Sequence, residues 1–253
     1  MKNQRQNEIL DMLSENHALS ASELSQKFHV SMETIRRDLE YLEKKGHLTR
    51  THGGAVSRSM LGTEPEYLQR QSENSKSKDA IGKAAASLVE DGDTLIIDSG
   101  TTTLAFTKYL AGFRRLTIFT NSLPVASELM KYPDLKIIIL GGVLRTGELS
   151  TSGFVAEDNL RLFHADKAFL GAGGLSLAHG MGDYHMEESN LKRLCVQHAQ
   201  KVIVLADHSK LGQIALNHTF PLKDIDVLIT DPLADAKFLS ELRRRDIRVI
   251  SAK

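Results

Sequence analysis

The stretch SMETIRRDL, residues 31–39, predicts the start of an amphipathic helix that carries two adjacent arginines. Ser31 can cap such a helix, and Ile35 and Leu39 begin an apolar face that continues at Leu42. Successive helical residues lie about 100° apart, so the arginine pair points away from that face. The pair is either a solvated surface or a contact for an anion such as DNA. The acidic residues that could balance a solvated pair are Glu33, Asp38, Glu40 and Glu43.

The residues around this helix predict a winged helix-turn-helix domain over residues 1–57. A first helix is expected over residues 3–16, and Ser20 can cap a second, with a glutamate three residues further on completing a capping box. Two short extended pieces, residues 47–50 and 55–57, flank a pair of glycines suited to a tight hairpin. Three helices followed by a hairpin are typical of this DNA-binding fold, although some winged helices bind protein partners instead.

The rest of the chain predicts a polar linker and a larger α/β domain. Residues 58–77 contain Pro65 and show little periodicity, whereas residues 78–253 alternate short apolar runs with helical segments. This alternation is typical of a mostly parallel sheet covered on both faces. The expected strands are residues 94–97, 116–119, 136–140, 167–170, 202–206, 227–230 and 248–250.

Composition narrows the class of protein. The 253 residues include 32 Lys and Arg and 32 Asp and Glu, which excludes a uniformly basic nucleic-acid coat but allows a local basic surface. The single cysteine, Cys195, can form neither an internal disulfide nor a cysteine zinc cluster. His179, His185 and Glu187 match no familiar metal spacing. We therefore expect a cytoplasmic protein without a metal, a cofactor or a membrane span.

The first turns of the helix after Ser31 are where recognition helices meet base edges. Arginine can bind guanine O6 and N7 together, and basic residues near a wing contact phosphates. The candidate DNA contacts are Ser31, Met32, Thr34, Arg36, Arg37, Lys44, Lys45, Arg50 and His52.

Polar loops follow the expected strands, where ligands gather in open α/β sheets. The loop DSGTTT, residues 98–103, offers backbone N–H groups, hydroxyls and a helix N-terminus to one phosphate. Neither GxxxxGK[ST] nor GxGxxG occurs there, which argues against a nucleoside triphosphate or a dinucleotide. The alternative is that the threonines only cap a helix. The candidate effector contacts are Asp98, Ser99, Gly100, Thr101, Thr102, Thr103, Asn121, Gly171 and Lys210, with the roles of Glu187, Glu188 and Lys192 left open.

Two patterns carry a family resemblance: LxxxFxVSxxTIRRDLxxL over residues 24–42 and GxLxRxHGGA over residues 46–55. Together they resemble the N-terminal signature of the DeoR family of bacterial transcription regulators, and the α/β half resembles the effector domain of that family. The resemblance implies a repressor of a sugar or polyol catabolic operon, controlled by a phosphorylated sugar. It also implies that Arg36 and Arg37 lie in the recognition helix.

The second half also resembles the ribose-phosphate isomerase and CoA-transferase type of fold, so a phosphosugar isomerase-like enzyme fused to a DNA-binding domain is an alternative. In isomerases of that fold the loop that matches residues 171–174 carries aspartates, whereas here it is GAGG. Binding without turnover is therefore favoured; a transcription activator is a further alternative. Because operators of such proteins usually have two half-sites, we expect double-stranded operator DNA to be bound by a homodimer or a larger even oligomer.

Overall fold

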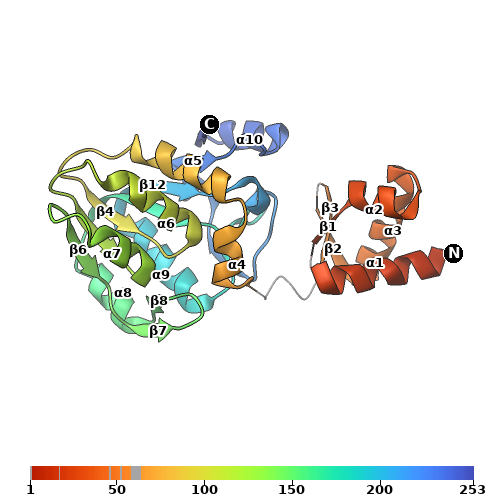
Figure 1. Cartoon of the computed structure of the whole chain (residues 1–253), viewed down its shortest axis with the longest axis horizontal. Coiled ribbons are helices and arrows are strands. Elements are labelled where there is room, and N and C mark those ends of the chain that lie inside the picture. Colours follow the sequence, from red (N-terminus) through yellow and green to blue (C-terminus); the bar gives the residue numbers. More distant parts are fainter. Residues whose placement is uncertain (1, 17, 46, 52, 58–63) are drawn as a thin grey trace. The chain divides into compact units, whose positions relative to one another are not determined.

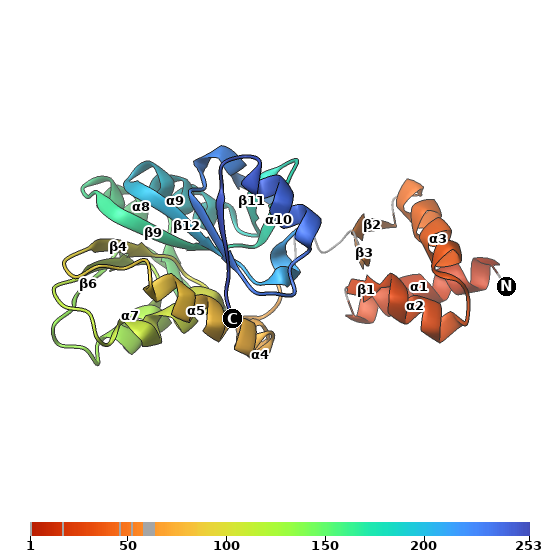
Figure 2. The same ribbon diagram turned by 90° about the horizontal axis from the view of Figure 1, so that it is seen from above.

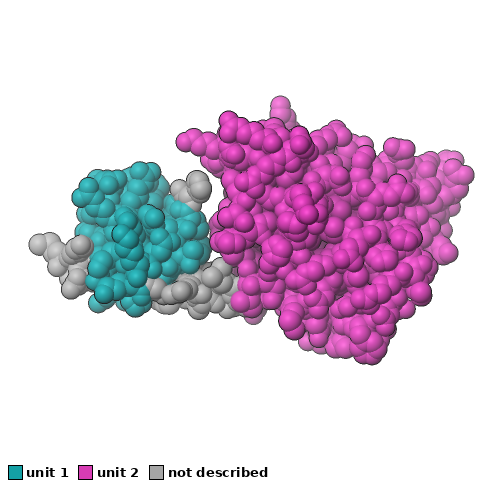
Figure 3. Space-filling view, turned by 180° about the vertical axis from the view of Figure 1, so that it is seen from behind, with its two compact units in different colours: residues 1–64 teal, residues 65–253 magenta. Residues whose placement is uncertain are grey.

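In the computed structural model, which describes residues 2–16, 18–45, 47–51, 53–57 and 64–253, the chain forms two units (Figure 3). The units are Met1–Glu64 and Pro65–Lys253. The elements of the first unit are α1 (Lys2–Asn16), β1 (Ala18–Ser20), α2 (Ala21–Phe28), α3 (Met32–Lys44), β2 (Leu48–Thr51) and β3 (Gly54–Ser57) (Figure 1).

Local hydrogen bonds explain where the helices of the first unit begin. The Ser20 hydroxyl accepts the Glu23 N–H and the Glu23 carboxylate accepts the Ser20 N–H, which confirms the predicted capping box of α2. The Ser31 hydroxyl accepts the Thr34 N–H at the start of α3. Between these helices, His29 adopts the left-handed conformation with φ 51° and turns the chain. Capping side chains and the left-handed His29 therefore fix where α2 and α3 of the predicted helix-turn-helix begin and end.

The wing is a three-stranded antiparallel sheet in the order β1-β3-β2. The strand β1 was not expected, because three residues are too few to show an alternating pattern. Gly54 is required by the close approach of β3 to β1: a Cβ atom there would lie 1.8 Å from the carbonyl oxygen of Leu19. By contrast, a Cβ at Gly53 would meet nothing within 4 Å. Of the two glycines, only Gly54 is therefore required for the pairing of β1 with β3.

The second unit contains a seven-stranded, wholly parallel sheet in the order β15-β14-β12-β9-β4-β5-β6, which confirms the expected fold class. Its strands are β4 (Thr94–Ile97), β5 (Thr117–Thr120), β6 (Lys136–Ile139), β9 (Ala165–Gly171), β12 (Ala199–Leu205), β14 (Val227–Thr230) and β15 (Arg248–Ser251). Its helices are α4 (Tyr67–Ser72), α5 (Ser75–Ala86), α6 (Thr101–Thr107), α7 (Leu123–Leu129), α8 (Phe154–Arg161), α9 (Met186–Gln197) and α10 (Ala236–Arg243).

Helices cover both faces of the sheet, with α8 and α9 on one side and α5 and α7 on the other (Figure 2). Each face has its own apolar core, and the strands contribute alternate residues to the two. In β4, Leu95 and Ile97 pack into the core under α5 and α7, whereas Ile96 packs into the core under α8 and α9. Strands buried on both faces explain why the sequence shows short continuous apolar runs rather than alternation.

The expected linker is shorter in the structure than residues 58–77. Residues 67–72 form α4 and α5 begins at Ser75, both within the second unit, while residues 58–63 lie outside the described residues. Tyr67 is buried, Arg70 forms an ion pair with Glu148, and the buried Lys78 ammonium donates to the carbonyl oxygens of Arg70 and Glu73. Tertiary contacts therefore order a polar segment that has no apolar periodicity.

Two small antiparallel sheets complete the second unit. One is the pair β7 (Val143–Arg145) and β8 (Ser150–Ser152), and the other has the order β10-β11-β13, formed by Gly174–Ser176, Gly180–Asp183 and Asn217–Phe220. None of the helices in the described part of the chain has the length and apolar character that crossing a bilayer requires.

Candidate functional site

The start of α3 presents exposed side chains in the first unit. Met32 and Arg36 are exposed, and the Ser31 hydroxyl lies 2.9 Å from that of Thr34. Arg37 lies 3.3 Å from Glu33 one turn away, and both side chains are more than half exposed, so this ion pair contributes little stability. Arg36 has no ion-pair partner among the described residues. The exposed surface of α3 thus keeps at least one guanidinium available to an anion.

Asp38 does not balance the arginine pair, contrary to one of the interpretations above. It is buried, and its carboxylate accepts from Arg5 at 2.7 Å and from Gln6 at 2.8 Å, both on α1. The carboxylate sits on the inner side of α3, where it fixes that helix against α1.

The remaining acidic residues of α3 hold the basic residues near the wing. Glu40 lies 2.8 Å from Lys44, and Glu43 accepts both the backbone N–H and the side chain of Arg50. The Lys45 ammonium lies 5.8 Å from the centre of the Tyr41 ring. His52 lies outside the described residues.

In the second unit, the sheet order reverses direction at β4. The chain runs from β4 to β5 and β6 on one side, then crosses to β9, β12, β14 and β15 on the other. In open α/β sheets, ligands bind at such a switch point, outside the carboxyl ends of the strands, which here is the position between β4 and β9. Asp98 follows β4, and its carboxylate accepts the Gly171 N–H at 3.0 Å. Two of the candidate effector residues therefore meet there.

A buried lysine from α9 reaches the same switch point. The Lys192 ammonium lies 3.1 Å from the Asp98 carboxylate, donates to the Gly171 carbonyl oxygen at 3.1 Å and contacts the Asp183 carboxylate. All three charged side chains are at most 5% exposed. Lys192 therefore belongs to this site, and Asp183, at the end of β11, is a member that the sequence did not suggest.

More carboxylates than ammonium groups surround this centre, and they shift the pKa values of Asp98 and Lys192. The pKa of Asp98 is raised to about 7, mainly by burial; Lys192 opposes this rise, and the carboxylates of Asp183 and Glu188 add to it. Burial lowers the pKa of Lys192, but the carboxylates of Asp183, Asp98 and Glu188 outweigh burial and raise it above its ordinary value. The lysine is therefore charged, and Asp98 exchanges a proton near neutral pH.

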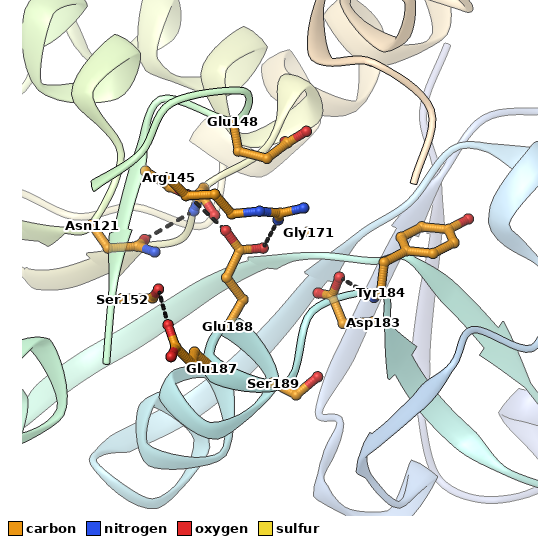
Figure 4. A network of polar contacts seen from close by, with 12 residues as sticks. Asn121, Arg145, Glu148, Ser152, Gly171, Asp183, Tyr184, Glu187, Glu188 and Ser189 are labelled. Atoms are coloured by element: carbon orange, nitrogen blue, oxygen red, sulfur yellow. Dashed lines mark hydrogen bonds and ion pairs between the residues drawn. The ribbon is translucent and has the colours of Figure 1, made fainter. Parts of the chain in front are cut away.

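A second group of polar contacts lies beside the first (Figure 4). Glu188 accepts from the Ser150 hydroxyl at 2.7 Å and from Arg145 at 3.1 Å, while Glu187 accepts from the Ser152 hydroxyl at 3.0 Å. These contacts join the start of α9 to the β7–β8 hairpin. Glu187 and Glu188, whose roles the sequence left open, therefore belong to a polar network beside the switch point.

The loop of residues 98–103 has the geometry of an open helix start. Gly100 has a φ of 150°, and no side chain of the described residues caps α6. Thr101 and Thr102 are each 9% exposed, and the Thr103 hydroxyl donates back to the Gly100 carbonyl oxygen. The first N–H groups of a helix have no intrahelical acceptor, so this end can receive an anion.

Asn121 and Lys210 take different positions. The Asn121 side chain accepts the Ser99 N–H at 3.1 Å and donates to the Thr151 carbonyl oxygen at 3.2 Å, so it positions the loop. Lys210 lies in the turn after β12. Burial lowers the pKa of Lys78; the charge of Asp207 raises it and that of Lys210 lowers it further. Lys210 and Lys78 therefore bring positive charge to the end of β12.

Asp207, His208 and Asp231 place their ligand atoms within 4.8 Å of one another, close enough to hold a metal ion. These atoms are already engaged, however. The Asp207 carboxylate accepts from Asn74 and from Ser209, and the Asp231 carboxylate lies 2.9 Å from Nδ1 of His208. The group accordingly orders the loops after β12 and β14.

Comparison with known proteins agrees with this architecture. Residues 5–60 match the model of the DeoR-like helix-turn-helix domain, and residues 73–232 match that of the DeoR C terminal sensor domain. The chain is 37% identical over 231 residues to the HTH-type transcriptional regulator GolR of Listeria innocua, covering 90% of each chain. It is 36% identical over 242 residues to the HTH-type transcriptional repressor GlcR of Bacillus subtilis, covering 96% of this chain and 93% of that one.

Similar solved structures include a ribose 5-phosphate isomerase A from Methanocaldococcus jannaschii, 20% identical, with a TM-score of 0.41 and 55% of each chain covered.

Proposed function

Since the chain belongs to the DeoR family of helix-turn-helix transcription regulators, we propose that it represses a sugar or polyol catabolic operon under the control of a phosphorylated sugar. The family is one of DNA-binding regulators rather than enzymes, with a domain that senses a small molecule. The curated relatives include the putative aga operon transcriptional repressor of Escherichia coli O157:H7, 31% identical over 98% of this chain and 93% of that one.

For DNA binding, the proposal rests on the exposed start of α3. Arg36 and Arg37 can reach base edges, and Met32 and Thr34 lie beside them, while Lys44, Lys45 and Arg50 supply phosphate contacts. Because Arg36 has no carboxylate partner among the described residues, its guanidinium breaks no ion pair when it meets a base.

For effector binding, one observation carries the proposal: the uncapped start of α6 and the buried Asp98–Lys192–Asp183 centre lie at the same switch point. A phosphate fits the N–H groups and threonines of α6 but is repelled by carboxylates. The hydroxyl groups of a sugar instead favour the carboxylates, because a hydroxyl can donate a hydrogen bond to a carboxylate oxygen. A molecule with a phosphate at one end and hydroxyls along its length matches both parts.

DNA binding also bears on how many copies of the chain assemble. A single winged helix contacts only one half-site, so two copies related by symmetry are needed to read an operator. We propose a homodimer or a larger even oligomer.

Operator binding is tested by fluorescence anisotropy with DNA from upstream of the chain's own operon. Arg36→Ala should weaken binding by about 1–3 kcal/mol, whereas Arg114→Ala, which removes the same charge from the second unit, should not. Equal affinity in both variants would contradict the proposed DNA surface. A thermal-shift screen of sugar phosphates against their unphosphorylated sugars tests the effector: stabilisation only by the unphosphorylated sugars would refute the phosphate assignment.

A further inference from the structure

A cavity of about 610 Å³ lies in the second unit, and none of its lining residues belongs to the switch point. Its apolar floor includes Leu177 and Leu222, and its basic side chains are His179, His218, Lys223 and Arg245. Small-molecule sites usually occupy about 300–1,000 Å³, so the cavity has the size of a metabolite site. We call it the basic groove.

The charges of the basic groove are uncompensated. None of the residues that line it is an aspartate or a glutamate. Neither Lys223 nor Arg245 has an ion-pair partner among the described residues, although other cations of this unit do, such as Lys167 with Asp93 and Arg145 with Glu188. In a chain with no formal net charge, a cavity lined only by basic and apolar side chains selects an anion.

The basic groove is built by close backbone packing. Gly180 has a φ of 70°, and a Cβ atom there would lie 2.5 Å from the Phe220 carbonyl oxygen and 2.9 Å from the Cα of Pro221. The β10–β11 hairpin thus lies directly against the end of β13. Arg245 donates to the Leu177 carbonyl oxygen at 2.7 Å, which holds its guanidinium at the edge of the groove. A cavity fixed in this way needs little ordering before it binds a ligand.

We propose that the basic groove is a second ligand site, which takes a small molecule carrying two phosphate or carboxylate groups on a short carbon skeleton. Two separated anionic groups can contact Lys223 and Arg245 while the carbon atoms cover the apolar floor. This ligand differs from the effector proposed above, because the switch point adds three carboxylates to its single anion-binding helix end.

The two sites share two strands. On β11, Gly180 lies in the groove and Asp183 contacts Lys192 at the switch point. On β13, His218 lines the groove, while Asn217 donates to the carbonyl oxygen of Tyr184 at 2.9 Å. A ligand in the groove that shifts either strand changes the affinity of the effector site, and the effect is reciprocal.

The test uses the imidazole signals of His179 and His218 in the NMR spectrum of the full chain, assigned with His179→Gln and His218→Gln. Propane-1,3-diyl bisphosphate and glutarate, which carry two phosphate or two carboxylate groups joined by three carbon atoms, are titrated separately, which distinguishes phosphate from carboxylate recognition. Both signals should shift along a saturating curve with at least one of these anions, and Lys223→Met/Arg245→Met should weaken the affinity about tenfold or more. The control Lys83→Met/Arg114→Met removes the same charges elsewhere in this unit and should leave the affinity unchanged.

A second pair of variants retains Lys223 and Arg245 and instead changes a neighbouring residue of the groove. Ala178 is an exposed residue of the groove, so Ala178→Asp adds a carboxylate there, and Ala178→Asn adds the same volume without charge. Only the aspartate variant should weaken anion binding. Shifts that never saturate with either anion, or equal weakening in the two Ala178 variants, would overturn the proposal. The effector screen is independent of either result.

Discussion

Asp98→Asn is expected to stabilise the second unit at pH 8 while it impairs the proposed effector site. The substitution keeps the shape of the side chain and an oxygen that can accept the Gly171 N–H, but it removes the buried charge. Lys192 still contacts Asp183 in the variant, so no cation is left without a partner.

The magnitude follows from proton linkage. The pKa of Asp98 lies at about 7 in the folded chain, above its ordinary value of 3.8, because burial disfavours the charged form. The resulting stabilisation is fully present below about pH 4 and is lost as the pH rises through 7. Since a tenfold change in proton affinity corresponds to about 1.4 kcal/mol, complete ionisation costs about 4 kcal/mol. An amide escapes this cost, and we expect the variant to gain about 2–4 kcal/mol at pH 8.

Urea unfolding of the full chain between pH 4.5 and 8 measures this gain. The chain has no tryptophan, and four of its five tyrosines, Tyr67, Tyr109, Tyr132 and Tyr184, lie in the second unit, so tyrosine fluorescence reports mainly on that unit. The difference in unfolding free energy between Asp98→Asn and wild type should grow with pH and level off above 7. The control Asp134→Asn removes an exposed carboxylate and should follow the wild type.

A variant that is less stable than the wild type at pH 8 would refute this reasoning. So would a difference that stays constant across the pH range. Either result would mean that the ion pair with Lys192 keeps Asp98 ionised well below neutral pH.

Three further outcomes are expected. Asp38→Asn should cost about 3 kcal/mol of unfolding free energy in the first unit, measured by thermal unfolding, because it leaves Arg5 without its buried partner; no loss would contradict that role. Gly54→Ala should disrupt the wing and reduce operator affinity, whereas Gly53→Ala, with open space around its Cβ, should not; equal effects would count against the close-approach argument. Thr101→Val should lose about 1 kcal/mol or more of effector affinity by calorimetry and retain operator affinity; an unchanged effector affinity would place the phosphate elsewhere.

Local signals in the sequence predicted the first unit well. Helix caps and apolar spacing depend on residues that are close in the sequence. They therefore predicted the start of α2 and the exposed face of α3. The partner of Asp38 did not, because Arg5 lies 33 residues away and nothing near either residue marks the contact.

The residues at the switch point divide in the same way into those that local signals predicted and those that they did not. Asp98 and Gly171 were predicted because parallel strands bring their carboxyl ends to one edge. Asp183 was missed because it ends β11, a strand too short to show the alternation of apolar and polar residues that marks a strand in a sequence. Lys192 carried a usable signal: it lies between Glu188 and Cys195 on one buried side of α9, and a lysine on such a side implies a buried partner.

The contact between Asp98 and Gly171 joins residues 73 positions apart, and Lys192 lies a further 21 positions along the chain. The first unit, in contrast, is complete within residues 1–64. During synthesis the ribosome therefore finishes the helix-turn-helix long before β9 exists. A nonsense mutation anywhere between β4 and α9 leaves a fragment that carries the DNA-binding fold without its switch point. Under the proposed function, a fragment that survives proteolysis and still occupies the operator as a dimer would not respond to the effector, and such alleles should act over an intact copy of the gene.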